Sequence, residues 1–218
     1  MPTTTEILNC PLVAGSELGN PDNHAAQIMK EVGDTLAKQD GVQQINFGMH
    51  IESPDTLQLF VNWDSLDAHK TFMTQAHYQP FLNRFLTIAG GAPSIAHADL
   101  KPDGAVSKAL AAPVTEIATF YFDSAPPSDA LENAQKFGKM LEDEKTEGFL
   151  GGAVGLTYEE IEREGVKGKG MVIAIGWESV DAHMKFRETA TFKDNINLLR
   201  NGAEKIEMHH VAFMSFVA

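Results

Sequence analysis

The chain has 218 residues, of which 43% are hydrophobic, and a formal net charge of −13. This composition supplies enough apolar side chains for one or two compact domains. Nucleic-acid binding is not expected, because it requires clustered Lys and Arg, and the same acidity disfavours an anionic membrane surface. The single cysteine, Cys10, cannot form an internal disulfide, and the sequence has neither a signal-peptide pattern nor a long apolar run. These features predict a soluble, cytoplasmic protein that contacts neither membranes nor nucleic acids.

The first half of the chain predicts the order strand, helix, strand, strand, helix, strand. Asn20 and Pro21 give a helix-start signal, and Gly41 is a residue type that commonly ends a helix. A second helical region extends to about Ala89. The expected strands are 5–14, 42–51, 56–63 and 95–100.

The second half predicts the same order of elements. Its helix-start signal is Pro126 and Pro127, and its first helix ends near Gly148. The expected strands are 114–123, 149–157, 170–177 and 204–216, with a second helical region that extends to about Asn201. An acidic and then Gly/Lys-rich insertion at 157–170 is expected to be a solvated loop, with a lid or partner-contact role as the alternative.

A repeated motif relates the two halves. WDSLDAHKTF starts at Trp63 and WESVDAHMKF starts at Trp177. The repeat is domain-sized, so we predict an α+β protein of two ferredoxin-like βαββαβ units, packed sheet to sheet as a single-chain pseudo-dimeric α/β barrel. The expected division is a first repeat at 1–103, a linker at 104–113 and a second repeat at 114–218, since the linker segment is rich in Ala, Gly and Pro.

The run from Trp63 through Asp-Ala-His to AHYQPFL, followed by Gly90 and a closing strand, resembles the antibiotic biosynthesis monooxygenase family of the dimeric α/β-barrel superfamily. Members usually dimerise single units, whereas this chain has two units fused. The resemblance implies cofactor-independent oxygenation of a small aromatic, quinol or polyketide-type substrate. The superfamily also contains decarboxylases, isomerases and haem-degrading enzymes, so activity does not follow from the fold.

Duplication separates residues found in both halves from residues found in one. Trp63 and His69 recur in the second half, so we interpret them first as framework residues. Asn9, Asn62 and His77 stand opposite Thr119, Gly176 and Thr191, and are therefore candidate catalytic residues of the first half alone. An imidazole in an apolar pocket can accept a proton from a phenolic or enolic substrate. Divergence without function is the alternative explanation.

The hypothetical pocket of the first repeat binds a small aromatic or hydrophobic molecule. Its expected substrate-binding residues are Trp63, His69, Tyr78, Phe81 and Phe85. No metal site is expected, because HExxH and Cys/His ligand sets are missing and the adjacent His209 and His210 point to opposite faces of a strand. No cofactor is expected either, because the sequence lacks GxGxxG.

Two further function classes stay open at this point. The first is a non-catalytic protein that binds small hydrophobic ligands or acts in a stress response. The second is a haem-binding protein, in which one of the eight histidines would be the axial ligand. Further oligomerisation of the chain is also left open by the sequence.

Overall fold

The computed structural model describes residues 3–216, and these form two units. The first unit comprises 3–97 together with 214–216, and the second comprises 98–213. Residues 214–216, which the expected division placed in the second repeat, belong to the first unit. Among the helices of residues 3–216, none has the length and apolar character needed to cross a lipid bilayer.

The first unit is a βαββαβ unit with one additional short strand. Its sheet has the order β4-β1-β3-β2-β9, and the pairs β1–β3, β2–β3 and β2–β9 are antiparallel. The elements are β1 (Thr4–Pro11), α1 (His24–Leu36), β2 (Val42–Met49), β3 (Thr56–Trp63), α2 (Leu66–Met73), α3 (Tyr78–Leu86), β4 (Ser94–Ala98) and β9 (Met214–Ser215).

The second unit repeats this order. Its sheet has the order β8-β5-β7-β6, with the pairs β5–β7, β5–β8 and β6–β7 antiparallel. The elements are α4 (Ala105–Leu110), β5 (Val114–Tyr121), α5 (Ala130–Asp143), β6 (Phe149–Arg163), β7 (Val166–Trp177), α6 (Val180–Arg187), α7 (Ala190–Asn195), α8 (Asn197–Arg200) and β8 (Lys205–Val211). The ferredoxin-like duplication predicted from the repeat is therefore confirmed.

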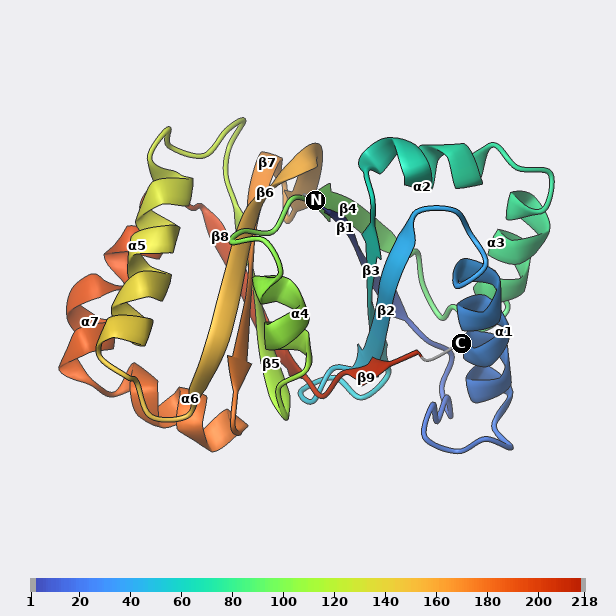
Figure 1. Ribbon diagram of the computed structural model, residues 1–218, viewed down its shortest axis with the longest axis horizontal. Coiled ribbons are helices and arrows are strands. Elements are labelled where there is room, and N and C mark those ends of the chain that lie inside the picture. Colours follow the sequence, from blue (N-terminus) through green and yellow to red (C-terminus); the bar gives the residue numbers. More distant parts are fainter. Residues whose placement is uncertain (1–2, 217–218) are drawn as a thin grey trace. The chain divides into compact units, whose positions relative to one another are not determined.

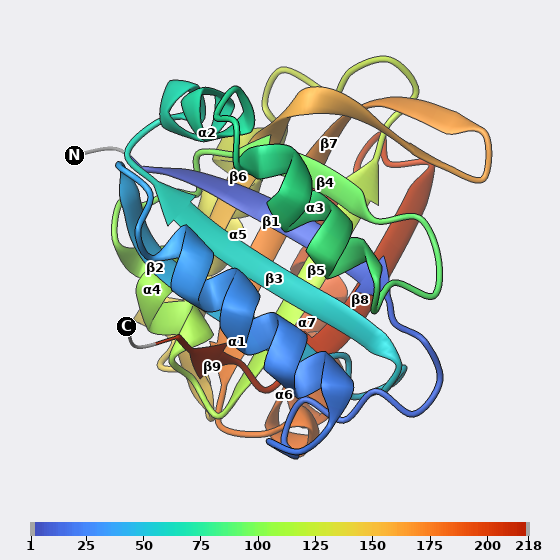
Figure 2. The same ribbon diagram turned by 90° about the vertical axis from the view of Figure 1, so that its right-hand side faces the viewer.

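In the first unit the helices cover one face of the sheet, as Figures 1 and 2 show for α1 and α3; in the second unit α5 to α7 lie on one face and α4 lies on the other (Figure 1). Strand alternation decides which side chains meet these helices. In β3, Leu57, Leu59, Val61 and Trp63 face the helices and join the first core with Ile28 of α1. In β7, Ile173, Ile175 and Trp177 do the same in the second unit, together with Phe137 of α5.

Three local predictions were wrong. The expected linker contains α4, whose Val106, Ala109 and Leu110 are buried, because the Ala-rich segment has a helical apolar face. The insertion at 157–170 is not a loop: it extends β6 and β7 into a longer hairpin, in which Glu162 pairs with Lys167. The strand expected at 204–216 is divided into β8 and β9, and β9 pairs with β2 of the first unit.

Candidate functional site

The repeated motif forms the same strand-to-helix turn in both units. Ser65 is the N-cap of α2 and accepts a hydrogen bond from the backbone N–H of Ala68, and Ser179 caps α6 in the same conformation. The alanine of the motif is small because Gly41 approaches it: a Cβ on Gly41 would lie 2.8 Å from the Ala68 Cβ. This turn places the motif histidine on the helix face that meets the sheet, next to the tryptophan that ends the strand.

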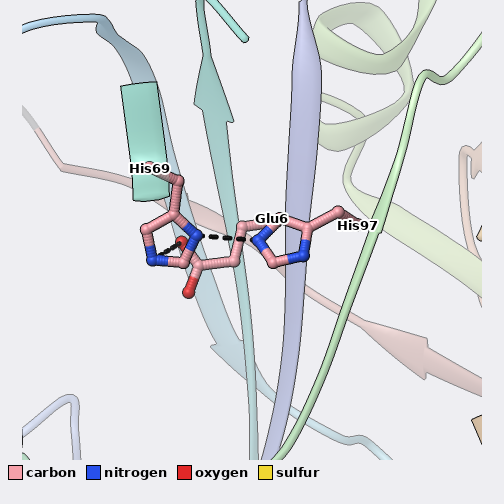
Figure 3. A group of neighbouring side chains, drawn as sticks. All are labelled: Glu6, His69 and His97. Atoms are coloured by element: carbon pink, nitrogen blue, oxygen red, sulfur yellow. Dashed lines mark hydrogen bonds and ion pairs between the residues drawn. The ribbon is translucent and has the colours of Figure 1, made fainter. Parts of the chain in front are cut away.

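In the first unit the turn assembles four buried side chains, Glu6, Trp63, His69 and His97, which we call the first tetrad. The Trp63 indole N–H donates to Glu6 Oε2 at 2.9 Å, and His69 Nε2 lies 3.6 Å from the same oxygen. His69 Nδ1 and His97 Nε2 are 2.7 Å apart and share a hydrogen bond. In Figure 3, dashed lines join one ring nitrogen of His69 to the Glu6 carboxylate and the other to the His97 ring.

The second unit repeats this arrangement in Glu116, Trp177, His183 and His210, the second tetrad. The Trp177 indole N–H donates to Glu116 Oε2 at 3.0 Å, and His183 Nε2 lies 3.3 Å from that oxygen. His183 Nδ1 is 2.7 Å from His210 Nε2. The indole and the imidazole stack with ring centroids 5.1 Å apart, as their counterparts do at 4.9 Å in the first unit.

Burial gives both carboxyl groups an unusually high pKa. Desolvation raises the pKa of Glu6 to about 7, and the hydrogen bond from Trp63 opposes this only in part. Desolvation likewise raises the pKa of Glu116 to about 7, against the opposing effects of the Trp177 hydrogen bond and the Arg187 charge. A carboxyl group with this pKa exchanges its proton near neutral pH, as a general base requires.

The first tetrad is also the group best suited to a metal ion among the described residues. Ligand atoms of Glu6, His69 and His97 lie within 4.8 Å of one another, and a carboxylate with two imidazoles is a donor set that transition metals use. However, His69 Nδ1 and His97 Nε2 are already in hydrogen-bond contact. A metal between these two nitrogens would require the rings to move apart, so the geometry fits proton sharing better.

Only the surroundings distinguish the two tetrads. In the second unit a cavity of about 70 Å³ lies between the sheet and helices α6 to α8, and Glu116, Trp177 and His183 line it. Its wall is otherwise mainly apolar, and Arg187 and the exposed Arg200 also line it. The cavity thus brings a base, several aromatic rings and two guanidinium groups to one place.

Smaller side chains in the second unit account for this space. Strand pairing makes Ala118 the counterpart of Leu8, because Leu8 pairs with Leu59 and Ala118 pairs with Ile173 at the same step of the repeat. The motif register makes Leu199 the counterpart of Phe85. Both units keep one edge-to-face pair, Phe72 with Tyr78 at 5.1 Å and Phe186 with Phe192 at 5.5 Å. The first unit adds Phe81, at 5.2 Å from Phe72, where the motif register gives the second unit Asn195.

The structure separates the predicted catalytic asparagines from the rest of the predicted pocket. Asn9 and Asn62 point to the sheet face opposite the helices, since strand neighbours alternate and Trp63 faces the helices. Thr5 Oγ1 donates to Asn62 Oδ1 at 2.8 Å, and His50 Nε2 lies 2.9 Å from Asn9 Oδ1. The prediction of one pocket that unites Asn9, Asn62 and Trp63 was wrong, because the sheet lies between them.

The remaining predicted residues lie on the helix side of the first unit. Trp63 and His69 belong to the first tetrad, and Tyr78, Phe81 and Phe85 pack on the same core. His77 is exposed, and its Nε2 lies 3.2 Å from Gln39 Oε1. Its surface position leaves His77 without the apolar pocket that a catalytic base of this kind requires.

The sequence prediction missed the two carboxylates and the two closing-strand histidines. Glu6 and Glu116 occupy the same position of the repeated Thr-Glu-Ile, and His97 and His210 recur in the last strand of each half. All the residues of each tetrad therefore recur in the other half, and an alignment of the two halves could have identified them. The sequence alone does not show which residues of neighbouring strands lie side by side. It therefore could not show that each strand histidine lies close to its carboxylate.

Comparisons with solved structures give the same architecture over the whole chain. An anthrone oxidase-like protein aligns over 99% of this chain and 94% of its own, with a TM-score of 0.74 and 13% identity. A candidate monooxygenase from Fusobacterium nucleatum aligns over 99% and 98% (TM-score 0.62, 13% identity), and one from Lactobacillus acidophilus over 99% and 96% (0.58, 10%). The chain shares their fold. The fold that the motif's resemblance implied, two fused ferredoxin-like units, is thereby confirmed, although no protein-family model and no curated protein matches the sequence.

Exchanging one residue between the units tests the origin of the cavity. Ala118→Leu gives the second unit the side chain of the first and is expected to fill the space beside Glu116 with little loss of stability. The matched change Leu8→Ala removes a buried side chain from a packed core and should cost about 2–5 kcal/mol. Chemical denaturation of both variants checks this. Equal losses of stability would mean that the two sites are packed alike.

Proposed function

We propose that the chain is a cofactor-independent, oxygenase-like enzyme, and that its reaction takes place beside the second tetrad. The observation behind this proposal is that the same buried tetrad occurs in both units while the second borders a cavity. A tetrad that only stabilised the fold would not need a cavity beside it in which a ligand could bind. The likeness in fold to an anthrone oxidase-like protein and to candidate monooxygenases supports the reaction class.

The substrate we propose is a small aromatic molecule with an acidic C–H or O–H group. Glu116, with its raised pKa, accepts this proton, and His183 and His210 share it along their hydrogen bond. The resulting carbanion is delocalised onto the substrate oxygen. The guanidinium groups of Arg187 and Arg200 stabilise that negative charge, because among the described residues neither has a carboxylate within 4.0 Å.

Dioxygen is the second reactant. The carbanion reduces it and forms a C–OOH group with the proton that the base returns. Removal of the second proton from the same carbon then expels water and leaves a carbonyl group, so that a CH₂ group and O₂ become a C=O group and H₂O. The protein supplies the base and the apolar surroundings, and these exclude the water that would otherwise reprotonate the carbanion.

Oxygen uptake with anthrone as substrate tests the proposal. Purified protein treated with a chelator, without added cofactor, is expected to consume one O₂ per anthrone and to yield anthraquinone, in which the CH₂ carbon has become a carbonyl group. Mass spectrometry with ¹⁸O₂ should find the label in that carbonyl group. Binding of anthrone without any oxygen uptake would contradict catalysis and would favour the alternative of a ligand-binding protein.

A further inference from the structure

The second unit contains a further hollow, which we call the α5 groove. It has a volume of about 380 Å³ and lies between α5 and β6. Ala134, Phe137 and Gly138 of α5 line one side, Phe149 and Gly152 of β6 line the other, and Lys101 and Pro102 lie at its edge. A volume of this size is typical of small-molecule sites.

The first unit shows what the corresponding place contains when it is filled. Each buried residue of α5 has a buried counterpart in α1 at one constant spacing, and the same spacing makes Gly33 the counterpart of Gly138. The pairs are Ala25 with Ala130, Met29 with Ala134, Val32 with Phe137 and Leu36 with Leu141. The strand register makes Ile45 the counterpart of Gly152, because Ile45 pairs with Val61 and Gly152 pairs with Ile175 at the same step of the repeat. The α5 groove therefore corresponds to the space between α1 and β2.

An aromatic ring occupies that space in the first unit. The backbone N–H of Phe216 donates to the carbonyl of Ile45 at 2.9 Å, directly after β9 has paired with β2. The Phe216 ring lies so close to Gly33 that a Cβ at this position would overlap it. Helix α1 thus lacks a side chain at Gly33, where the ring approaches it.

In the second unit, residues 98–101 run beside β6 as β9 runs beside β2, but the chain does not continue to an aromatic residue in the groove. Ala98 pairs with Thr157, and Lys101 exchanges two backbone hydrogen bonds of 2.8 Å with Val154 of β6, as β9 does with β2. The chain then turns away at Pro102 and enters α4. As a result, a Cβ on Gly138 would meet no atom within 4 Å. Ala134 and Gly152, in place of Met29 and Ile45, widen the space further.

We propose that the α5 groove binds a planar aromatic ring of a small molecule, in the position that the Phe216 ring takes in the first unit. Phe137 and Phe149 supply apolar contacts for the faces of the ring. The cations at the edge are already compensated, since Lys101 pairs with Asp103 and Lys139 pairs with Asp143. The groove therefore suits an uncharged ring that carries a hydroxyl or carbonyl group, which the Gln135 amide can bind at the rim.

This binding does not depend on the reaction proposed above, although the groove and the catalytic cavity share Phe137, Ile173 and Ile175 as lining residues. A ring in the groove lies against side chains that also wall the site of the second tetrad. The groove can therefore hold either a separate ligand or a second ring of an extended substrate; in both cases an aromatic ring is bound at Gly138.

Titration of the ¹⁵N-labelled full chain with 2-naphthol tests the proposal. The amides of Gly138 and Gly152 are expected to shift in a saturable manner. Gly138→Leu should fill the groove from the helix side, weaken the binding at least about tenfold, and raise the melting temperature because leucine favours a helix more than glycine does. Gly138→Ala gives a similar helix gain with a smaller side chain and is expected to retain most of the binding.

Two further measurements make the outcome decisive. Glu116→Gln, which should strongly lower turnover, is expected to leave the shifts at Gly138 unchanged, so that failure of catalysis and failure of the groove are distinguishable. Shifts confined to the Trp177 indole N–H would place 2-naphthol in the catalytic cavity and overturn the proposal. Unchanged affinity in Gly138→Leu, or equal affinity for cyclohexanol, would overturn it as well.

Discussion

Glu116→Gln is expected to lower kcat by about 10² to 10⁴, the range that general-base catalysis contributes. The matched variant Glu6→Gln should leave kcat within about threefold of the wild type, because the first tetrad has an equivalent carboxyl group but larger side chains around it. Steady-state oxygen uptake with anthrone measures both variants. Glu6→Gln is a matched control for Glu116→Gln, since both glutamates accept a hydrogen bond from a tryptophan and have a pKa of about 7.

Neither substitution is expected to disturb the fold, so the kcat values of the two variants can be compared directly. A glutamine oxygen at either position can still accept the hydrogen bond from the Trp63 or Trp177 indole N–H, so both variants keep the link between strand and motif. Near-ultraviolet circular dichroism checks the packing of these two tryptophans. Equal losses of kcat in the two variants, with intact spectra, would move the reaction away from the second tetrad.

The pH profile of the wild type provides a second readout of the same residue. A base acts in its ionised form, so kcat/KM is expected to rise with pH, with a midpoint near the Glu116 pKa of about 7. Substrate ionisation is separated by repeating the profile with an analogue of different acidity. A midpoint that follows the substrate instead of the enzyme would assign the titration to the substrate.

Most of the fold could be predicted from the sequence because the duplication shows every element twice. Strand β3 was expected at 56–63 and forms at Thr56–Trp63, since its alternating residues meet apolar surfaces on the helix side. Predictions failed where tertiary contacts override local composition. The Ala-rich segment 105–110 becomes a helix once Leu110 is buried, and strand pairing across Glu162 and Lys167 orders an otherwise polar insertion.

The site was harder to predict for a physical reason. Residues present in both halves were interpreted as framework, so His69 and His183 received little weight although each belongs to a tetrad. The difference between the units lies in side-chain volume: Ala118 in place of Leu8 opens space beside a tetrad that both units share. A polar residue that is present in only one half, such as Asn62, can be seen in the sequence. A cavity cannot be seen there, because its volume depends on all the side chains around it.

The free energy of unfolding is expected to fall as the pH rises from about 4.5 to about 7. Glu6 and Glu116 have pKa values of about 7 in the folded chain and 4.5 as the ordinary value, so the folded state binds more protons in this window. Each carboxyl group therefore contributes stability that is fully present below pH 4.5 and is lost through pH 7, on the order of 3 kcal/mol per group. Guanidinium chloride unfolding between pH 4 and pH 8.5 measures this slope.

Glu6→Gln isolates one of these groups, because glutamine keeps the shape and stays uncharged at every pH. Relative to the wild type, this variant is expected to gain on the order of 3 kcal/mol between pH 5 and pH 8, and Glu116→Gln should gain a similar amount. Glu31→Gln is the control, since the hydrogen bond from Arg84 lowers the pKa of Glu31 and outweighs the opposing effect of desolvation. A Glu6→Gln difference that is constant with pH would mean that the Glu6 carboxylate is ionised throughout the window. His69 would then have to be its cationic partner, and the first tetrad would be a buried ion pair instead of a shared proton.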